Sequence, residues 1–247
     1  MLSCFNVQSA YATKYWFTEI HMGDKRIWRR NEDPSMVEWN KFCDKLHNLI
    51  PSLTADFMQH HQSIIERLAV DGQSAASPDS DKVQSSQYQE NGSWQAVLLK
   101  YTNEYADVKS TTPDVDKKFP TAYCLLEEFG DNCPIALYSC MAPQTVLQRH
   151  TGPENIEGKY IRVHVPLIVP KGELFLEVNG DFVTWDDIFC FDNQFVHSAH
   201  NYSDEWRLIL FIDFLRESIG IPPGLPYDEQ RSGDTNIRFD QNRQQIN

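Results

Sequence analysis

The chain has 247 residues, of which 41% are hydrophobic, and this is enough to bury a substantial core. The composition therefore excludes a disordered chain and a small scaffold held together by disulfides. The 22 Lys and Arg residues are outnumbered by 35 Asp and Glu, for a net charge of −13. Because such an excess of acid repels a phosphate backbone, we expect no nucleic-acid partner.

The sequence shows no signal for export or membrane insertion. The N-terminal residues contain no uninterrupted apolar run, and no segment approaches the roughly 20 consecutive apolar residues that span a bilayer. We therefore expect a cytoplasmic protein without a transmembrane segment, in which the six cysteines stay reduced. Cys124, Cys140 and Cys190 lie within apolar runs and are expected to be buried free thiols.

The N-terminal part of the chain is predicted to be helical. Apolar residues recur at helical intervals over 33–50 and again over 52–70, and Pro51 is expected to separate two helices. Residues 71–93 are rich in Ser, Gln, Asp and Gly, a composition typical of an exposed linker. Residues 1–93 are thus predicted to form an N-terminal extension made of helices and a polar linker.

From Trp94 the pattern changes to short apolar runs between turn signals, which is typical of a β-sandwich or barrel. The runs are WQAVLLKY, PIALYSCM, YIRVHVPLIV, ELFLEV, DIFCF and WRLILFIDF. A short helix at 121–129 is expected to pack on the strands. Residues 94–216 are predicted to form one β-rich domain, and residues 217–247 a polar C-terminal tail.

Two histidines stand at the ends of predicted strands. His150 opens the turn sequence HTGP, and His197 follows the strand sequence IFCFDNQFV. Imidazoles delivered from the strand ends of one closed sheet can converge on a metal ion, although a hydrogen-bonded core histidine is the commoner case. His200, in the predicted turn HSAHNYSD, is either a rival ligand or a solvated turn residue, and the second reading is favoured.

Strand alternation sends two arginines to a face that looks internal. In YIRVHVPLIV, Arg162 and His164 share one face, and in WRLILFIDF, Arg207 shares a face with Phe211. Burying a guanidinium without a counter-charge is costly, so an inward arginine implies an internal carboxylate or a carboxylate ligand. Arg207 follows His197 at the distance of one turn and a return into the adjoining strand. A metal at the histidines with an arginine farther along the cavity would suit a dicarboxylate.

A series of short strings, in this order and spacing, resembles the aspartyl/asparaginyl β-hydroxylase family. The resemblance runs from about Trp94 to Phe214, close to half of the chain. The strings are GSW at 92–94, PTAYCLLEEF at 120–129, YSCMAP at 138–143, HTGP at 150–153, IRVHVPLIVP at 161–170, TW at 184–185, FDNQFVH at 191–197 and RLILFIDF at 207–214.

The resemblance implies an oxygenase that depends on iron(II) and 2-oxoglutarate and consumes O2. The implied fold is mainly β with flanking helices, around a double-stranded β-helix core of the jelly-roll, cupin-like kind. By resemblance, His150 and His197 would hold the iron, and Arg207 and Ser139 would bind the distal carboxylate of 2-oxoglutarate. The catalytic set is then His150, His197 and Arg207. The implied 2-oxoglutarate pocket comprises Trp94, Ser139, Arg162, Val163, His164 and Arg207.

Gly152 stands where most oxygenases of this kind carry a carboxylate ligand to the iron. The family that the chain resembles shares this glycine, so two protein ligands are expected, with water in the vacant position. Asp192 and Asp213 lie near the relevant strands. Asp192 is out of phase with His197, and neither carboxylate is expected to replace the third ligand.

The implied reaction is hydroxylation of an unactivated carbon, with release of succinate and CO2. The expected substrate is an amino acid, a peptide or another small molecule, with the β-carbon of an Asp- or Asn-type residue as the favoured target. Two alternatives stay open. A halogenase on the same fold would use the vacancy at Gly152 and give chloride-dependent products, whereas a non-catalytic cupin-like binding module would hold no iron.

Overall fold

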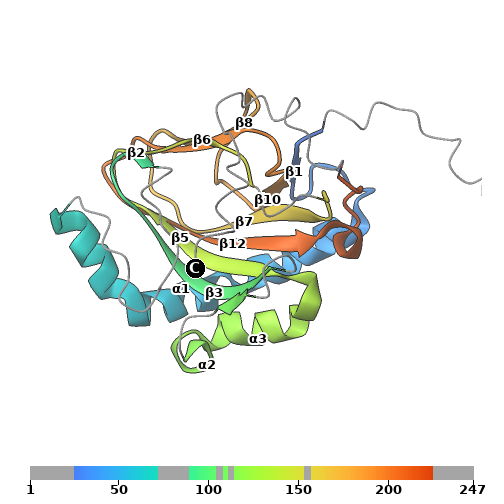
Figure 1. The fold of residues 1–247 in the computed structure, drawn as a ribbon, viewed down its shortest axis with the longest axis horizontal. Coiled ribbons are helices and arrows are strands. Elements are labelled where there is room, and N and C mark those ends of the chain that lie inside the picture. Colours follow the sequence, from blue (N-terminus) through green and yellow to red (C-terminus); the bar gives the residue numbers. More distant parts are fainter. Residues whose placement is uncertain (1–24, 72–88, 104–107, 111–113, 153–156, 225–247) are drawn as a thin grey trace, which may run out of the picture.

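The computed structural model describes residues 25–71, 89–103, 108–110, 114–152 and 157–224. Two β-sheets face each other, and helices pack on the outer side of the larger sheet (Figure 1). Most of the predicted linker and the end of the predicted tail, residues 72–88 and 225–247, lie outside the described residues. Within the described ranges, no helix combines the length and the apolar character needed to cross a membrane.

The larger sheet contains seven antiparallel strands in the described part of the chain. In spatial order they are β1 (Ile27–Arg29), β10 (Phe189–Phe191), β7 (Tyr160–Ile168), β12 (Arg207–Leu215), β5 (Ile135–Met141), β3 (Trp94–Asn103) and β4 (Val108–Ser110). The strand β12 lies between β5 and β7, so its inward side chains stand at the centre of the sheet.

The smaller sheet faces it with five strands among the described residues. In spatial order they are β2 (Gln89–Asn91), β6 (Thr145–His150), β11 (His197–Asn201), β8 (Leu174–Val178) and β9 (Asp181–Val183). From β5 to β12 the chain crosses repeatedly between the sheets, because β5, β7, β10 and β12 belong to the larger one and the others to the smaller one. This crossing pattern is that of a jelly roll, and the predicted double-stranded β-helix is confirmed.

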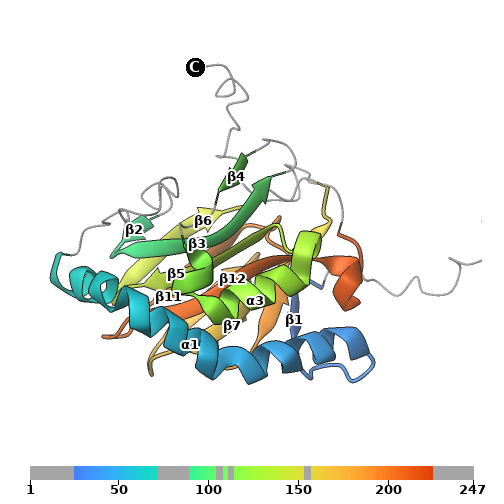
Figure 2. The same ribbon diagram turned by 90° about the horizontal axis from the view of Figure 1, so that it is seen from below.

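The helices cover the outer face of the larger sheet, and α1 and α3 lie side by side in front of it in Figure 2. They are α1 (Val37–Asp71), α2 (Val115–Lys118) and α3 (Pro120–Phe129), and two 3₁₀ turns follow at η2 (Gly130–Asn132) and η4 (Arg216–Ile219). The helix predicted at 121–129 is confirmed as α3. Pro120 occupies its first turn, where a missing backbone N–H costs nothing.

The prediction that Pro51 separates two helices is wrong, because α1 continues through it. A proline inside a helix removes one hydrogen bond and costs about 3 kcal/mol. Leu46, Leu53 and Phe57 are completely buried on either side of Pro51, in the core between α1 and the sheet. Each such side chain contributes about 1.5–3 kcal/mol on burial, so their sum outweighs the local penalty.

Strand alternation divides the apolar residues into two layers. One layer, which includes Val163 and Ile212, packs between the larger sheet and the helices. The other, which includes Met141 and Ile209, packs between the two sheets. The segment before Trp94 contributes β1, β2 and α1 to this architecture, and the predicted domain boundary at that residue stays a prediction.

All five cysteines in the described residues are free thiols. Cys43, Cys133, Cys140 and Cys190 are buried, but Cys124 is exposed on α3, contrary to the prediction. The apolar stripe of α3 passes through Ala122, Leu125, Leu126 and Phe129, and leaves Cys124 on the solvent side.

Candidate active site

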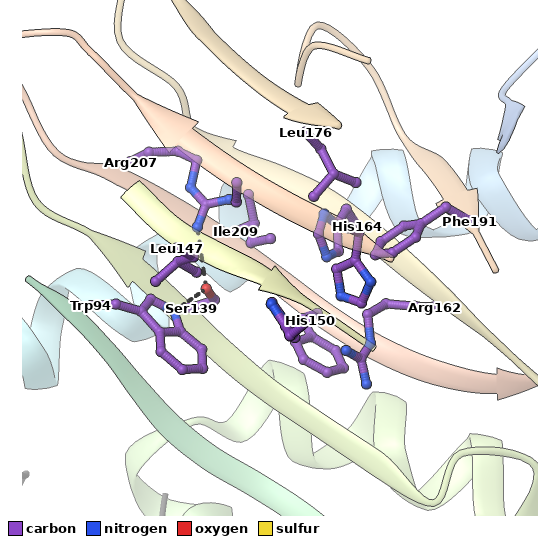
Figure 3. Close-up of a pocket in the computed structure, with 13 residues that line it drawn as sticks. Trp94, Ser139, Leu147, His150, Arg162, His164, Leu176, Phe191, Arg207 and Ile209 are labelled. Carbon is purple, nitrogen blue, oxygen red and sulfur yellow. Dashed lines mark hydrogen bonds between the residues drawn. The ribbon is translucent and has the colours of Figure 1, made fainter. Parts of the chain in front are cut away.

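A cavity lies between the two sheets, and its empty space, including the part open to solvent, measures about 480 Å³. Figure 3 shows Arg207, Ser139 and Trp94 toward one end, and His150, His164 and Arg162 toward the other. The lining residues are Trp94, Ser139, Leu147, His150, Arg162, His164, Leu176, Phe191, His197, Ala199, Arg207, Ile209 and Phe211.

Seven of the eight site residues expected from sequence thus meet in one cavity, and Val163 is the exception. Its side chain is completely buried in the core that faces the helices. Strand alternation requires this, because Arg162 and His164 on either side of it face the cavity. The Val163 side chain therefore does not line the cavity, and the expected part of this residue in the 2-oxoglutarate pocket stays a prediction.

His150 and His197 are direct partners across the β6–β11 ladder, with ring centres 4.3 Å apart. The Nδ1 atom of His150 lies 2.7 Å from the Gln148 carbonyl oxygen, and the Nδ1 atom of His197 lies 2.9 Å from that of Phe195. Because a carbonyl oxygen can only accept, both Nδ1 atoms must carry the proton. Each ring therefore has its lone pair on Nε2, the form in which imidazole binds a metal.

The electrostatic surroundings keep His197 neutral. Burial lowers its pKa well below the ordinary value, and the proximity of His150 and Arg162 adds to the effect. The pKa of His164 is lowered in the same direction by burial, and then by Arg207 and Arg162. Both imidazoles are consequently neutral near pH 7.

Two local expectations about this region are wrong. His197 begins a strand, β11, instead of ending one. Arg207 is not on an adjoining strand, because β12 pairs with β5 and β7 while β11 pairs with β6 and β8. Arg207 therefore reaches the cavity from the opposite sheet, and both sheets contribute residues to the site.

Arg162 finds its counter-charge inside the protein. Its guanidinium donates from Nε and Nη2 to the two carboxylate oxygens of Asp213, at 2.8 and 2.9 Å. The two residues are register partners on β7 and β12, and the guanidinium carbon lies 4.0 Å from the centre of the Phe211 ring. Of the two possibilities left open by the sequence for Arg162, the internal carboxylate is the one present.

Arg207 has no such partner among the described residues. It is 1% exposed and its Nη2 atom donates to Ser139 Oγ at 3.2 Å, whereas its Nε atom is buried without an acceptor. No carboxylate in the described residues forms an ion pair with it. Burial lowers the pKa of Arg207 to about 9, so the guanidinium is still charged at neutral pH.

Ser139 extends this donor arrangement. Its oxygen accepts from Trp94 Nε1 at 2.8 Å and from Arg207 Nη2 at 3.2 Å. A serine hydroxyl can accept two hydrogen bonds and donate one, so both lone pairs are occupied and the proton remains to be donated. Arg207 and Ser139 together therefore present N–H and O–H donors at one end of the cavity.

The loop before His197 is fixed by Asp192. Its carboxylate pairs with Arg216 and accepts from the Gln194 backbone N–H at 3.1 Å, and its carbonyl accepts from the Phe195 N–H. Asp192 is thus committed to holding the loop, as Asp213 is to Arg162. Among the described residues, no three His, Cys, Asp or Glu side chains converge in a way that could hold a metal.

His200 lies on the outer face of β11, away from the cavity, and the prediction that it occupies a turn is wrong. Its ring stacks on Phe175 with centres 4.5 Å apart. Its Nε2 and Nδ1 atoms lie 3.0 Å from Ser198 Oγ and from the Tyr202 hydroxyl, respectively. Its place on the opposite face of β11 from His197 and Ala199 excludes it as a rival to His150 and His197.

Several residues around the site were not expected from the sequence. Leu147, Leu176 and Ala199 line the cavity from the smaller sheet, and the strands of Leu147 and Ala199 carry polar residues that hide the alternation. Trp185 lies behind the residues that line the cavity. The TW string at 184–185 contributes to the family resemblance, but the sequence assigns no role to this tryptophan. The sequence places Asp213 near the site, but it does not predict the ion pair with Arg162, because that pair depends on the register between β7 and β12.

The model of the aspartyl/asparaginyl β-hydroxylase family matches residues 59–217 of this chain. An ornithine lipid ester-linked acyl 2-hydroxylase of Rhizobium tropici is 33% identical over 85 residues, which cover 33% of this chain and 29% of that protein. An aspartate β-hydroxylase domain-containing protein 2 of Xenopus tropicalis is 34% identical over 123 residues, which cover 44% of this chain and 31% of that protein. The similarity to these relatives thus spans less than a third of their length.

Among solved structures, a 2OG-Fe(II) oxygenase family oxidoreductase from Burkholderia pseudomallei is similar to this chain with a TM-score of 0.39 and 11% sequence identity. The comparison covers 81% of this chain and 98% of that one.

Proposed function

The chain belongs to the aspartyl/asparaginyl β-hydroxylase family, and from this premise we propose that it is an iron(II)- and 2-oxoglutarate-dependent hydroxylase. The observation that carries the proposal is the arrangement of one cavity. It has two histidines with lone pairs on Nε2 at one end and, at the other, a buried arginine that has no carboxylate partner among the described residues.

The histidine end fits iron(II). His150 and His197 would hold the ion through Nε2, and the backbone carbonyls of Gln148 and Phe195 would keep each ring in the required tautomer. Two protein nitrogens leave several positions on the metal for other ligands. A bidentate 2-oxo acid and O2 need such positions, and a closed four-ligand site would not offer them.

The arginine end fits the distal carboxylate of 2-oxoglutarate. Arg207 would supply the positive charge and Ser139 the hydroxyl proton, with Trp94 holding the serine oxygen in place. A carboxylate bound there would satisfy the buried guanidinium, which otherwise has a single hydrogen bond, to Ser139. The position of Arg162 is consistent with a role near the metal, where its charge is already balanced by Asp213.

Iron(II) with 2-oxoglutarate would supply the oxidising power, by converting 2-oxoglutarate and O2 to succinate and CO2 as the substrate is hydroxylated. The chain's own residues would bind, orient and exclude water. The wall residues Phe191, Ile209 and Phe211 are apolar and would keep the reacting centre dry.

For the substrate we propose an amino acid or peptide that carries an Asp- or Asn-type side chain. The family description supports this class. The printed name of the Rhizobium tropici relative states an acyl-chain substrate for that protein, so a lipid-linked acyl chain is the comparison to include in any assay.

The test is turnover by the purified chain with iron(II), ascorbate, O2 and 2-oxoglutarate, against a panel of Asp and Asn peptides and acyl lipids. We expect iron-dependent formation of succinate, coupled for one substrate class to the addition of an oxygen atom. His197→Ala should abolish succinate formation, whereas His200→Ala, on the outer face of the same strand, should retain it.

The proposal fails if the wild-type chain forms no succinate with any of these substrates, or if His197→Ala is as active as His200→Ala. An added chloride arm separates hydroxylation from halogenation. If the products carry chlorine in place of the added oxygen, the protein is a halogenase and not a hydroxylase.

A further inference from the structure

Trp185 lies directly behind the wall of the cavity. It is 2% exposed and belongs to the segment between β9 and β10. Its side chain is not one of those that line the cavity, yet it contacts two that are, His164 and Arg207. These two residues come from different strands, β7 and β12, and Trp185 connects them from outside.

The contact with His164 fixes a tautomer. Trp185 Nε1 donates to His164 Nδ1 at 3.1 Å. An indole nitrogen can only donate, so His164 Nδ1 must carry the lone pair and the proton of the neutral ring must be on Nε2. His164 is therefore the opposite of His150 and His197, whose Nδ1 atoms face backbone carbonyls and carry the proton. The cavity has two histidines with a lone pair on Nε2 and one with a proton there.

The contact with Arg207 fixes the direction of the guanidinium. Its central carbon lies 4.4 Å from the centre of the Trp185 ring. Ser139 provides the single hydrogen bond to this guanidinium, and no carboxylate in the described residues pairs with it. The indole ring and the Ser139 oxygen are therefore the two contacts that hold the guanidinium in place and direct its N–H groups.

We propose that Trp185 is a positioning residue that gives the cavity its pattern of donors for a dicarboxylate. Through its indole N–H it makes His164 a donor at Nε2, and through its ring it aims Arg207 at the end that contains Ser139. The identity of the dicarboxylate as 2-oxoglutarate rests on the proposed function. Without the indole N–H, His164 can move its proton to Nδ1, and a lone pair on Nε2 would then repel a carboxylate.

Two substitutions separate the two contacts. Trp185→Phe keeps an aromatic ring for Arg207 but removes the N–H donor, whereas Trp185→Leu removes both. Long-range ¹⁵N–¹H NMR of the metal-free protein distinguishes the imidazole tautomers, and the His164 signals are assigned by their absence in His164→Gln. We expect His164 to be protonated on Nε2 in the wild type and to lose this preference in Trp185→Phe, while the signals of His150 and His197 stay unchanged.

Titration calorimetry supplies the second readout. It measures the binding of manganese(II) alone, and then the binding of 2-oxoglutarate to the manganese-loaded chain. Binding of manganese(II) should be the same in all three proteins. The dissociation constant for 2-oxoglutarate should rise about tenfold in Trp185→Phe, as expected for a lost hydrogen bond to a charged group. In Trp185→Leu it should rise about tenfold more, because the cation–π contact is also lost.

A wild-type His164 protonated on Nδ1 would overturn the inference, and so would an unchanged tautomer in Trp185→Phe. An affinity of Trp185→Phe for 2-oxoglutarate within twofold of the wild-type value would overturn the inference as well. Loss of manganese(II) binding in Trp185→Phe would also overturn it, because Trp185 would then have only a structural role. If the wild type binds manganese but not 2-oxoglutarate, the proposed function fails. The NMR result still decides whether Trp185 sets the His164 tautomer, because it needs neither ligand.

Discussion

Two buried arginines in one cavity illustrate how a residue's partner decides what it can do. Arg162 and Arg207 come from neighbouring strands and both face inward. Arg162 is neutralised by Asp213 through two short hydrogen bonds, whereas Arg207 has a serine oxygen and an indole ring. The first arrangement is complete within the protein, whereas the second has no counter-charge among the described residues and would be completed by an anion. In this account the charge that binds the ligand is that of Arg207.

The two arginines should therefore respond in opposite ways when their charge balance is changed. Asp213→Asn strands a buried guanidinium and should lower the free energy of unfolding by roughly 3–5 kcal/mol. Arg207→Met removes a buried charge that lacks a counter-ion, so the ligand-free protein should be at least as stable as the wild type. Urea unfolding of the ligand-free proteins measures both effects.

Urea unfolding with 2-oxoglutarate and manganese(II) present measures how much the ligand stabilises each protein. The ligand should stabilise the wild type by mass action, and Arg207→Met should lose most of this stabilisation. A strongly destabilised ligand-free Arg207→Met protein, or one that the ligand stabilises as much as the wild type, would contradict the assignment of Arg207.

At the scale of elements, α1 shows that a local rule can be overridden by packing. Pro51 lies on the exposed side of the helix, while Leu46, Leu53 and Phe57 bury its inner side. The proline penalty is therefore still present in the folded protein. It is outweighed by the buried side chains but not removed.

Pro51→Ala should consequently stabilise the protein by about 1–3 kcal/mol, because alanine restores the backbone donor and has the highest helix propensity. The matched control is Pro120→Ala, since Pro120 occupies the first turn of α3, where proline is favourable. Denaturant midpoints should rise for Pro51→Ala and stay unchanged or fall for Pro120→Ala. Equal shifts for the two variants would show that the local helix penalty is not the cause.

The elements that the sequence predicted were those with strong apolar patterns. The strands β5, β7 and β12 and the helix α3 agree with the expected runs to within one residue at each end. The strand β11 has a polar sequence, HSAHN, which predicts a turn. His197 and Asn201 are nevertheless buried, by ring contacts and by hydrogen bonds to carbonyls. Polar residues that are buried for function are the ones that hydrophobic periodicity cannot identify.

At the scale of the whole molecule, the resemblance and the alternation together predicted which side chains meet, but not how they are paired. Two inward arginines were expected, and both are found. The register between β7 and β12 decides which arginine pairs with an internal carboxylate, and this register cannot be predicted from the sequence. The placement of Arg207 on the wall opposite His197 likewise follows from the crossing of the chain between two sheets.

The distribution of thiols offers a probe of the global fold. Burial raises the pKa of Cys133 and Cys140 to about 12, and it raises the pKa of Cys43 and Cys190 as well. These four thiols should stay protonated and shielded as the pH rises from about 7 to about 9, and should react with a maleimide only after unfolding. The exposed Cys124 should react in the native state.

Peptide mapping by mass spectrometry after timed labelling separates the five sites. Modification of the four buried thiols should appear only on addition of denaturant, at one common rate if unfolding is cooperative. Labelling of Cys140 as fast as that of Cys124 in the native protein would contradict the placement of β5 at the interior of the larger sheet.

We propose that one cavity holds iron(II) between His150 and His197 and 2-oxoglutarate between that iron and Arg207. An anaerobic titration of the purified chain with iron(II) and 2-oxoglutarate, followed by visible absorption, tests it most directly, because chelation of iron(II) by a 2-oxo acid gives a charge-transfer band. We predict a saturable band at one iron per chain that persists in His200→Ala, needs more 2-oxoglutarate in Arg207→Met and is absent in His197→Ala. A wild-type chain that gives no band, or a band of equal strength in His197→Ala, would contradict the account.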